Sequence, residues 1–344
     1  MMNSLLKEVG RGKRGSRDLT YDEAFRAAEF ILNGVATPAQ IGAFLIAQRL
    51  KMESTEELIA FLDVCRGESY IHPIEGGLDC AAPYDGRSRS FYAALPTAFI
   101  LTACGIPVTL HSSPTLPPKN GVTLYEMLQQ LQIKVDSLNK HTLIHAAEKS
   151  GFLFVPTEKW CPPLARIRDL RTELELRTLF NTVEKLLRFS DAPNMTIGIF
   201  HGTVVDKIAK LVRQSGVQQS LVIQGMEGSD DISVERRTRA YWVSEEKKEW
   251  IVIDPELLEL QATYPEMNWT VEQQCDTFLS VLKGNSPLPF YHTVLLNAGV
   301  RIWLCGKSGS IEQGIYEAKY ILDNGHALDS FNQWKETVLT SMKV

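Results

Sequence analysis

The sequence lacks the marks of a secreted, zinc-binding or membrane-spanning protein. Its six cysteines are scattered over 344 residues without a C-x-x-C pair, which argues against both a disulfide framework and a zinc site. The longest apolar run, around residues 95–104, is broken by Pro96 and Thr97 and is too short to span a bilayer. No basic leader precedes an apolar segment, and no internal repeat is present. These absences predict a cytoplasmic protein with reduced core cysteines and no membrane partner.

An overall excess of positive charge is missing as well, because the formal net charge of −5 excludes a protein that is basic over its whole surface. The exception is a cluster near the N-terminus, which we call the basic segment. Its five cations lie within residues 7–17, a stretch that has Glu8 as its one acidic residue: Lys7, Arg11, Lys13, Arg14 and Arg17. Clustered cations are typical of surfaces that contact phosphate-bearing partners such as nucleic acid. A solvated, partly ordered arm would have the same composition, so both interpretations remain open.

The N-terminal region has the spacing and punctuation of packed helices. Two capping boxes, Thr20 with Glu23 and Ser54 with Glu57, predict helix starts, and Thr37-Pro38 predicts another between them. Apolar residues recur at helical spacing after each start. A hydrophobic content of 44% in 344 residues is enough for one large core and a smaller one, so we expect two domains.

The rest of the chain alternates between strands and helices. We expect strands at residues 152–155, 196–200 and 220–224, and a hairpin of residues 239–243 with 250–253. We expect helices at residues 138–149, 162–189, 204–214, 271–282, 287–305 and 311–324. Such alternation is typical of a mostly parallel sheet with helices on both faces.

Residues 78–128 have the strongest functional pattern. A short apolar strand (78–82) leads into a turn that contains Tyr84, Asp85, Gly86 and Arg87, and a helix (91–104) and a second strand (107–111) follow. A strand, loop, helix and strand in this order direct a loop and a helix N-terminus at an anion. The sequence therefore predicts a site for a phosphate-bearing ligand in this segment.

Several phrases, together with the order of the elements, resemble the anthranilate phosphoribosyltransferases and their nucleoside-phosphorylase relatives over nearly the whole chain. They are RTELELRTLFN at 171–181, LLNA at 295–298, GK at 306–307, SIEQG at 310–314 and KNG at 119–121. The resemblance implies a small all-α domain and a large α/β domain with a mostly parallel sheet, and a ligand cleft between the two. It implies a helical domain of residues 1–72 completed by about 162–190, an α/β domain of 73–161 and 191–344, and a homodimer that forms through the helical domain.

In that family, the amides of a G-T-G-G-D loop, a serine of an N-I-S-T motif and Mg²⁺ hold phosphoribosyl diphosphate. Here the loop has become Ala81-Ala82-Pro83-Tyr84-Asp85, and the second motif has become Tyr92-Ala93-Ala94-Leu95. Pro83 removes one N–H group, the added Cβ atoms crowd the loop, and Ala94 has no oxygen to offer a metal. The resemblance therefore implies a phosphate-binding loop that has been rewritten.

The resemblance also supplies candidate site residues. For substrate binding they are Asp85, Gly86, His111, Lys119 and Arg171, and for Mg²⁺ they are Asp230 and Asp231. Arg171 matches the arginine that holds the carboxylate of anthranilate. Each group has a structural alternative as well: a surface ion pair of Arg171 with Glu175, a satisfied polar role for His111, and a capping role for the Asp-rich loop.

Two functions of different class follow. The first is a divergent transferase that binds Mg²⁺ and a phosphorylated sugar such as phosphoribosyl diphosphate, with little or no activity on anthranilate. The second is a non-catalytic paralogue that binds nucleic acid or another polyanion through the cleft and the basic segment. Residues 10–19 resemble the N-terminus of divergent, nucleic-acid-binding members, which favours the second, whereas the acidic total charge favours the first.

Overall fold

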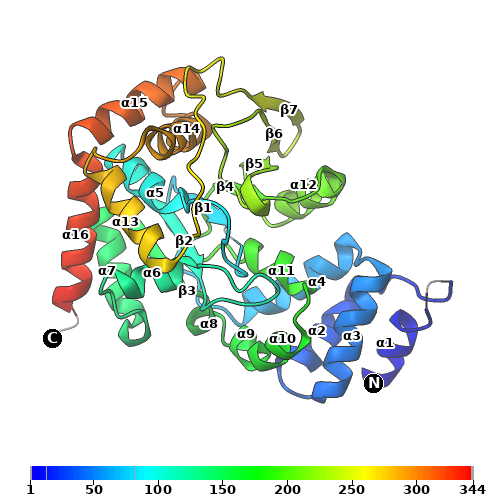
Figure 1. Ribbon diagram of the computed structural model, residues 1–344. Helices are drawn as coiled ribbons and strands as arrows, with labels where there is room; N and C mark the ends of the chain where they lie inside the picture. Colours follow the sequence, from blue (N-terminus) through cyan, green and yellow to red (C-terminus); the bar gives the residue numbers. More distant parts are fainter. Residues whose placement is uncertain (1, 13, 82, 342–344) are drawn as a thin grey trace.

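Seven strands form a single sheet in the computed structural model, which describes residues 2–12, 14–81 and 83–341 (Figure 1). Their order is β3-β2-β1-β4-β5-β6-β7, and neighbours are parallel except for the antiparallel pairs β5–β6 and β6–β7. The strands are Leu78–Ala81 (β1), Val108–Ser112 (β2), Phe152–Pro156 (β3), Asn194–Gly198 (β4), Gln219–Ile223 (β5), Thr238–Ser244 (β6) and Lys248–Ile253 (β7). The expected strands and the hairpin are confirmed, with ends shifted by a residue or two.

The chain changes direction across the sheet between β1 and β4. From β1 it runs through α5 (Ala94–Ala103) to β2 and on to β3, whereas from β4 it runs the other way through α12 (Val205–Gln214) to β5. Because parallel crossovers are right-handed, α5 and α12 lie on opposite faces of the sheet. The loops that leave the carboxyl ends of β1 and β4 therefore diverge and open a crevice, which is the usual ligand site of such sheets.

The other helices of the α/β region pack around this sheet. They are α6 (Leu124–Gln130), η1 (Val135–Ser137), α7 (Lys140–Ser150), α8 (Thr157–Trp160), η3 (Gly202–Val204), η4 (Met226–Gly228), α13 (Val271–Leu282), α14 (Leu288–Leu304), α15 (Ile311–Asp323) and α16 (His326–Ser341). Across residues 2–12, 14–81 and 83–341, each helix is too short or too polar to cross a membrane.

Helix α16 is missing from the sequence-based expectation, which ended the chain with three helices and is therefore one helix short. Its buried residues Phe331, Trp334 and Val338 recur at helical spacing, and the helix packs on α5 and α7. The ring centre of Trp334 lies 5.0 Å from that of Phe152, which in turn lies 4.8 Å from that of Phe99. The sequence-based prediction ended at the break formed by Asn324 and Gly325, and it therefore omitted a helix that covers the main core.

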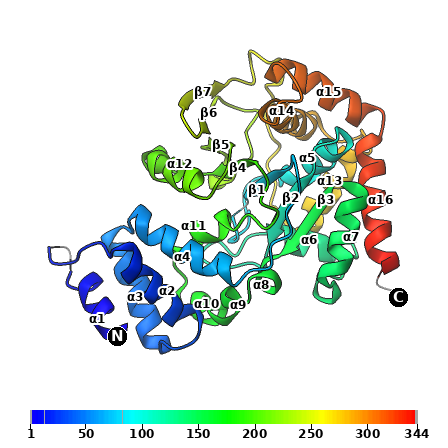
Figure 2. The ribbon, with the colours of Figure 1, turned by 180° about the vertical axis from the view of Figure 1, so that it is seen from behind.

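The helical region lies beside the α/β region and combines two parts of the chain (Figure 2). Its helices are α1 (Met2–Val9), α2 (Tyr21–Leu32), α3 (Pro38–Lys51), α4 (Thr55–Gly67), α9 (Pro162–Arg166), α10 (Arg168–Leu174), α11 (Phe180–Val183) and η2 (Glu184–Leu186). The middle helices α9, α10 and α11 contact α2, α3 and α4 respectively. The predicted capping boxes of Thr20 and Ser54 are both present. The domain bounds drawn from the resemblance stay a prediction.

Two details of the helical region differ from expectation. The single helix expected over 162–189 is broken into short pieces, because Glu175 adopts a left-handed backbone with φ 50° that ends α10. In addition, the start of the basic segment is helical, since α1 buries Met2 and Val9 and packs against α3. The break after α10 matters for function, because it directs residues 175–185 towards the sheet.

Candidate functional site

The crevice at the carboxyl ends of β1 and β4 contains a small pocket of about 160 Å³, which we call the cleft. Its walls come from the loops after β1, β4 and β5 and from the chain between α10 and η2. The ionisable residues that line it are Tyr84, Asp85, Arg177, Glu184, Lys185 and Glu227. The helical region therefore closes one side of the cleft, and the sheet edge closes the other.

Backbone contacts fix the loop after β1. Gly86 has φ 72°, and a Cβ atom there would lie 2.3 Å from the carbonyl oxygen of Gly121, so only glycine fits this position. The amide of Arg87 donates to the carbonyl of Val122 at 2.8 Å, and the reverse bond has the same length. The predicted substrate residue Gly86 thus has a structural role, which is to join this loop to the loop after β2.

Arg87 and Asp231 form a fully buried ion pair behind this loop. Nη2 of Arg87 lies 2.6 Å from Oδ2 of Asp231, and the amide of Ala94 donates to the same oxygen at 3.2 Å. Burial is the largest single effect and lowers the pKa of Arg87, but Asp231 and the other acidic groups nearby together outweigh it, so the net pKa is raised. Arg87 is therefore a permanent cation at the Asp-rich loop.

Asp230 is enclosed in the same way. Its Oδ2 accepts hydrogen bonds from Nη2 of Arg301 at 2.8 Å and from Oγ1 of Thr196 at 2.6 Å. Arg301, on α14, is fully buried and also lies 3.5 Å from Oδ1 of Asp231. Two carboxylates therefore face two guanidinium groups and make a neutral cluster, which we call the aspartate–arginine cluster.

This arrangement does not fit the Mg²⁺ ion that the family resemblance implies. Magnesium prefers about six oxygen ligands, several of them waters, whereas Asp230 and Asp231 have no exposed surface. Ala94 presents an N–H group to Asp231 where a ligand oxygen would be needed. Among the described residues, no group of three or more His, Cys, Asp or Glu side chains is arranged to hold a metal ion. We therefore derive no role for a metal at this cluster.

The backbone amides that follow Arg87 donate hydrogen bonds to a carboxylate of the protein itself, that of Glu227. Glu227 accepts hydrogen bonds from the amide of Arg89 at 2.9 Å and from the hydroxyl of Ser90 at 2.7 Å. It also accepts from the amide and the hydroxyl of Ser88, each at 3.3 Å. Burial alone would raise the pKa of Glu227, but these hydrogen bonds hold it below its ordinary value. Donors that would suit a phosphate thus bind a group of the protein itself.

Arg171 is paired internally too, and its partner is not Glu175. Its Nη1 lies 2.7 Å from Oε2 of Glu184, and both side chains are buried. The surface pair expected with Glu175 is therefore wrong, because α10 ends there and the chain folds back to bring Glu184 beneath Arg171. Burial raises the pKa of Glu184, and Arg171 opposes that rise.

His111 is a buried core residue with polar partners of its own. Its Nδ1 lies 2.5 Å from the hydroxyl of Tyr84, and its ring contacts Phe189 edge-on. Its Nε2 lies 3.5 Å from Oδ1 of the buried Asp79. Burial raises the pKa of Tyr84 well above its ordinary value, so that hydroxyl stays protonated. A satisfied polar role for His111 is therefore met at Nδ1 alone, because Nε2 and both carboxylate oxygens of Asp79 are buried without a hydrogen-bond partner.

Asp85, Lys119 and Arg177 form a charge network beside the cleft, which Asp85 and Arg177 line. Arg177 donates to Oδ2 of Asp85 at 2.6 and 3.1 Å. Nζ of Lys119 lies 3.5 Å from Asp85 and 3.7 Å from Glu227, and burial lowers its pKa. Asp85 and Lys119 are thus brought together as the sequence-based assignment implied, while Arg177 was missing from it.

Lys185 is a cleft residue that the sequence reading missed. Its Nζ donates to the carbonyl oxygens of Gly198 at 3.1 Å and of Gly228 at 3.2 Å, and no described carboxylate lies within 4.0 Å of it. Burial lowers its pKa to about 8. Residues 183–187 read Val-Glu-Lys-Leu-Leu, so the sequence around Lys185 gave no signal that sets it apart from an ordinary helical lysine. Lys185 adds a positive charge to the cleft that no acid among the described residues balances at close range.

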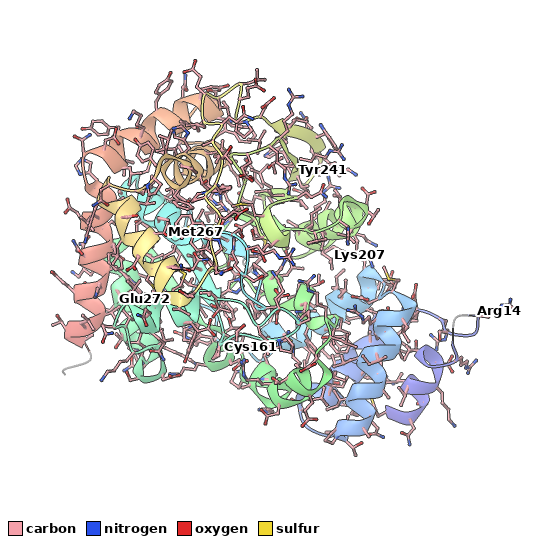
Figure 3. All side chains as sticks on the ribbon, viewed as in Figure 1. Arg14, Cys161, Lys207, Tyr241, Met267 and Glu272 are labelled. Carbon is pink, nitrogen blue, oxygen red and sulfur yellow. The ribbon has the colours of Figure 1, made fainter. Side chains whose placement is uncertain are left out.

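The basic segment lies at the far end of the helical region, and Arg14 projects from its loop away from the rest of the protein (Figure 3). Glu8 pairs with Arg11 at 2.7 Å and with Arg17 at 3.0 Å, and Arg17 also binds Glu23. Lys7 and Arg14 are exposed, and Lys13 lies outside the described residues. The segment is therefore less positive than its sequence indicates, and its described residues do not line the cleft.

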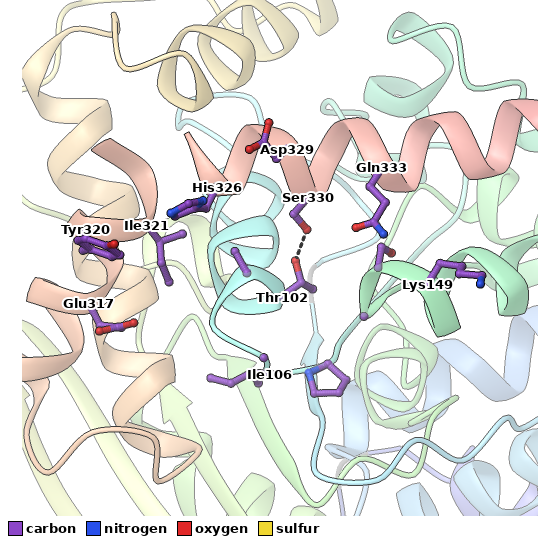
Figure 4. Close-up of a pocket in the computed structure, with 15 residues that line it drawn as sticks. Thr102, Ile106, Lys149, Glu317, Tyr320, Ile321, His326, Asp329, Ser330 and Gln333 are labelled. Carbon is purple, nitrogen blue, oxygen red and sulfur yellow. Dashed lines mark hydrogen bonds between the residues drawn. The ribbon is translucent and has the colours of Figure 1, made fainter. Parts of the chain in front are cut away.

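A larger hollow of about 860 Å³ lies away from this site, where Thr102 of α5 bonds Ser330 of α16 at 2.7 Å (Figure 4). Its wall includes Pro107 and Gly151, which directly precede β2 and β3. It therefore lies at the amino ends of the strands, opposite to the edge where sheets of this type bind ligands.

The chain is similar to known proteins over nearly its whole length. Residues 3–68 match the helical bundle domain of a glycosyl transferase family, and residues 86–328 match its a/b domain. Anthranilate phosphoribosyltransferases of Desulfitobacterium hafniense (strain Y51) and Aquifex aeolicus are each 29% identical, over 93% and 96% of this chain and 95% and 98% of their own lengths.

Solved structures show the same fold. The anthranilate phosphoribosyltransferase of Thermus thermophilus has a TM-score of 0.81 at 20% identity, covering 97% of this chain and 99% of its own. That of Saccharomyces cerevisiae in complex with PRPP and Mg has a TM-score of 0.84 at 17% identity, covering 98% of each chain. The small helical domain and the larger α/β domain with a mostly parallel sheet are thereby confirmed.

The Arg171–Glu184 pair predicts a large stability effect. Arg171→Met or Glu184→Gln leaves one buried charge without its partner, which costs about 3–5 kcal/mol of unfolding free energy. The double variant Arg171→Met/Glu184→Gln should cost less than the sum of the two, because neither charge is then left alone. Urea denaturation measures all three, and Glu175→Gln serves as the exposed control with a change within about 0.5 kcal/mol. Additive single costs, or a control as costly as Glu184→Gln, would contradict the pairing.

Lys185 predicts a specific pH dependence of stability. Its pKa is about 8 in the folded protein against an ordinary value of 10.5, so the unfolded chain binds more protons between these values and stability rises with pH across that window. The rise reaches about 3 kcal/mol at most. Denaturation curves at several pH values should show this rise in the wild type and in Lys210→Met, an exposed lysine, but a smaller one in Lys185→Met. Equal rises in both variants would refute it.

Proposed function

Because this chain belongs to the glycosyl transferase family that includes the anthranilate phosphoribosyltransferases, we propose that it binds a phosphorylated sugar in the cleft and transfers little or none of it to anthranilate. The observation that supports this most directly is the Arg171–Glu184 pair. The arginine that would hold the carboxylate of anthranilate already has a buried carboxylate at 2.7 Å. An incoming acceptor would have to displace Glu184 and leave its charge buried without a partner.

The diphosphate end of the cleft supports the same proposal. Pro83 has no N–H group to give, and Tyr84 fills the former glycine position with a buried ring whose hydroxyl bonds His111 and Thr157. The donors of Ser88, Arg89 and Ser90 are occupied by Glu227. Hydrogen-bond donors of this kind stabilise developing charge in a transferase, but here they bind side chains of the protein itself.

What remains in the cleft is suited to binding an anion. Asp85 pairs with Arg177, Glu184 with Arg171 and Glu227 with Lys119, each within 4.0 Å. Arg171 and Lys119 do not line the cleft themselves, but with them counted the three carboxylates are balanced, and Lys185 is the cation of the described lining that has no close acid. A phosphate group at Lys185 would receive a charge-assisted hydrogen bond at a partly enclosed position. We therefore propose a phosphate monoester of a sugar as the class of ligand, with Lys185 as its main cation.

A homodimer is also part of the proposal. The helical region presents an apolar hollow of about 1250 Å³ between α1 and α3, and Leu50 and Met52 are 79% and 65% exposed at its border. Large exposed apolar side chains around one hollow are typical of association surfaces. We propose that a second copy of this chain covers this face.

The proposed function predicts a separation of binding from turnover. Each lost group that stabilised charge in the transition state costs about 10²-fold or more, so formation of phosphoribosyl anthranilate should be far slower than with the Desulfitobacterium hafniense relative assayed in parallel. Ribose 5-phosphate should nevertheless raise the melting temperature of the wild type, and this shift should be lost in Lys185→Met but kept in Lys210→Met. Turnover at the rate of the relative would refute the first part, and an unchanged shift in Lys185→Met would refute the second.

Binding of nucleic acid through the basic segment is the second candidate, and it is favoured by the exposure of Lys7, Arg11 and Arg14. Affinity for single-stranded nucleic acid should then fall with salt by about 0.7 log units per phosphate neutralised, per log unit of salt. Arg11→Ala/Lys13→Ala/Arg14→Ala should flatten this slope and leave the fold intact, because the segment precedes the Thr20 cap. Fluorescence anisotropy at several salt concentrations measures the slope, and Lys335→Ala/Lys319→Ala, on α16 and α15, is the control. Equal slopes in the wild type and the triple variant would exclude the segment as the contact.

A further inference from the structure

The aspartate–arginine cluster balances its own charges, and this limits what else it can hold. Asp230 and Asp231 carry two negative charges, and Arg87 and Arg301 carry two positive charges within 2.6 to 3.5 Å of them. All four side chains are fully buried. A carboxylate pair of this kind would need a divalent cation if the two arginines were absent, because two like charges in contact cannot both stay ionised.

We propose that the guanidinium group of Arg87 permanently takes the place of a divalent cation at the Asp230–Asp231 pair, so that this protein binds its phosphate-bearing ligand without metal. The phosphate-bearing ligand in this proposal is taken from the proposed function. The exclusion of metal from the Asp230–Asp231 pair is argued from the aspartate–arginine cluster alone. Arg301 belongs to α14 and binds the pair from the core side, where it also contacts Asn297 of the same helix. Arg87 comes from the loop after β1, whose residues Pro83, Tyr84 and Asp85 line the cleft, whereas Arg87 itself is fully buried and does not line it.

Contacts on several sides hold Arg87 in this place. Its guanidinium lies over the ring of Tyr92, 4.7 Å from the ring centre, and Nη1 donates to the carbonyl of Phe91 at 3.1 Å. Gln274 of α13 fixes the same segment, because it accepts from the amide of Tyr92 and donates to the carbonyl of Ser90, each at 2.8 Å. Tyr92 stands where the resembling family has asparagine, so the ring that supports Arg87 belongs to the rewritten motif.

Displacing this cation by a metal ion would require the loss of several interactions at once. If a metal ion displaced Arg87, the guanidinium group would stay charged and would have to leave a fully buried position. Its hydrogen bonds to Asp231 and to the carbonyl of Phe91 would both be lost. The metal would gain few ligands in return. Oδ1 of Asp230 and Oδ1 of Asp231 are the carboxylate oxygens of the pair that accept no hydrogen bond, and neither is exposed. Metal at millimolar concentration should therefore leave the cluster unchanged.

The experiment measures Mn²⁺ binding by electron paramagnetic resonance. The sharp signal of free Mn²⁺ decreases as the ion binds to the protein. Wild type should leave that signal unchanged at millimolar Mn²⁺. Arg87→Ser/Ala94→Ser removes the internal cation and supplies an oxygen beside Asp231, and it should bind Mn²⁺ at least tenfold more tightly than the wild type. Arg89→Ser/Ala94→Ser is the matched control, because Arg89 is an exposed arginine on the same loop, and it should behave as the wild type.

If the Arg87 variant does not fold, Mn²⁺ binding and melting temperatures measured on the wild-type protein still test the proposal. Binding of Mn²⁺ to the wild type that disappears in Asp231→Asn would overturn it, and so would a folded Arg87→Ser/Ala94→Ser variant that binds no more Mn²⁺ than its control. A melting-temperature shift by ribose 5-phosphate that persists in excess EDTA supports the metal-free binding, whereas a shift that requires Mg²⁺ refutes it. A complete lack of any shift, with and without Mg²⁺, refutes the proposed ligand and leaves the Mn²⁺ result to decide the closure of the pair.

Discussion

The contact between Arg87 and Asp231 joins parts of the chain that are otherwise far apart. It links the loop after β1 to the loop after β5, and Arg301 extends the link to α14. The loop after β5 also packs tightly on β4, since a Cβ atom at Gly198, the last residue of that strand, would come within 2.0 Å of the backbone of Ser229. Removing one partner of such a buried pair costs about 3–5 kcal/mol, which is a large part of the stability of an ordinary domain. The carboxyl edge of the sheet therefore depends on this cluster for its shape.

The same principle operates at the other positions where the relatives' fold would receive a ligand. Glu227 satisfies the donors of residues 88–90, and Glu184 neutralises Arg171. In each case a side chain of this protein supplies the charge that, under the proposed function, a substrate or cofactor would bring in the relatives. Buried charges are tolerated only when they are paired, so the loss of an external partner and the gain of an internal one belong together. Lys185 is the described charged residue of the cleft that has no partner of opposite charge within 4.0 Å. For this reason we propose an anionic ligand.

The fold could be read from the sequence because its signals are local. Capping boxes, strand patterns and the expected hairpin depend on residues close together in the chain, and they appear where expected. Helix α16 was missed because only Asn324 and Gly325 separate it from α15. The partners in the site could not be read in this way. Arg87 and Asp231 are 144 residues apart, and Arg171 meets Glu184 only because Glu175 takes a left-handed backbone and turns the chain.

Internal pairing gives the fold a source of stability that does not depend on which ligand the protein binds. Changing Arg87 alone towards the family's glycine-rich loop would leave Asp231 buried without its cation, and changing Glu184 alone would do the same to Arg171. Each single step is costly, although paired changes could be nearly neutral in stability. Stability alone therefore keeps these residues in place, independently of any ligand. Contacts among the residues of the candidate site thus help to hold the shared architecture, and the proposed function relies on the groups that these contacts leave over: the ammonium group of Lys185 and the surface outside the cleft.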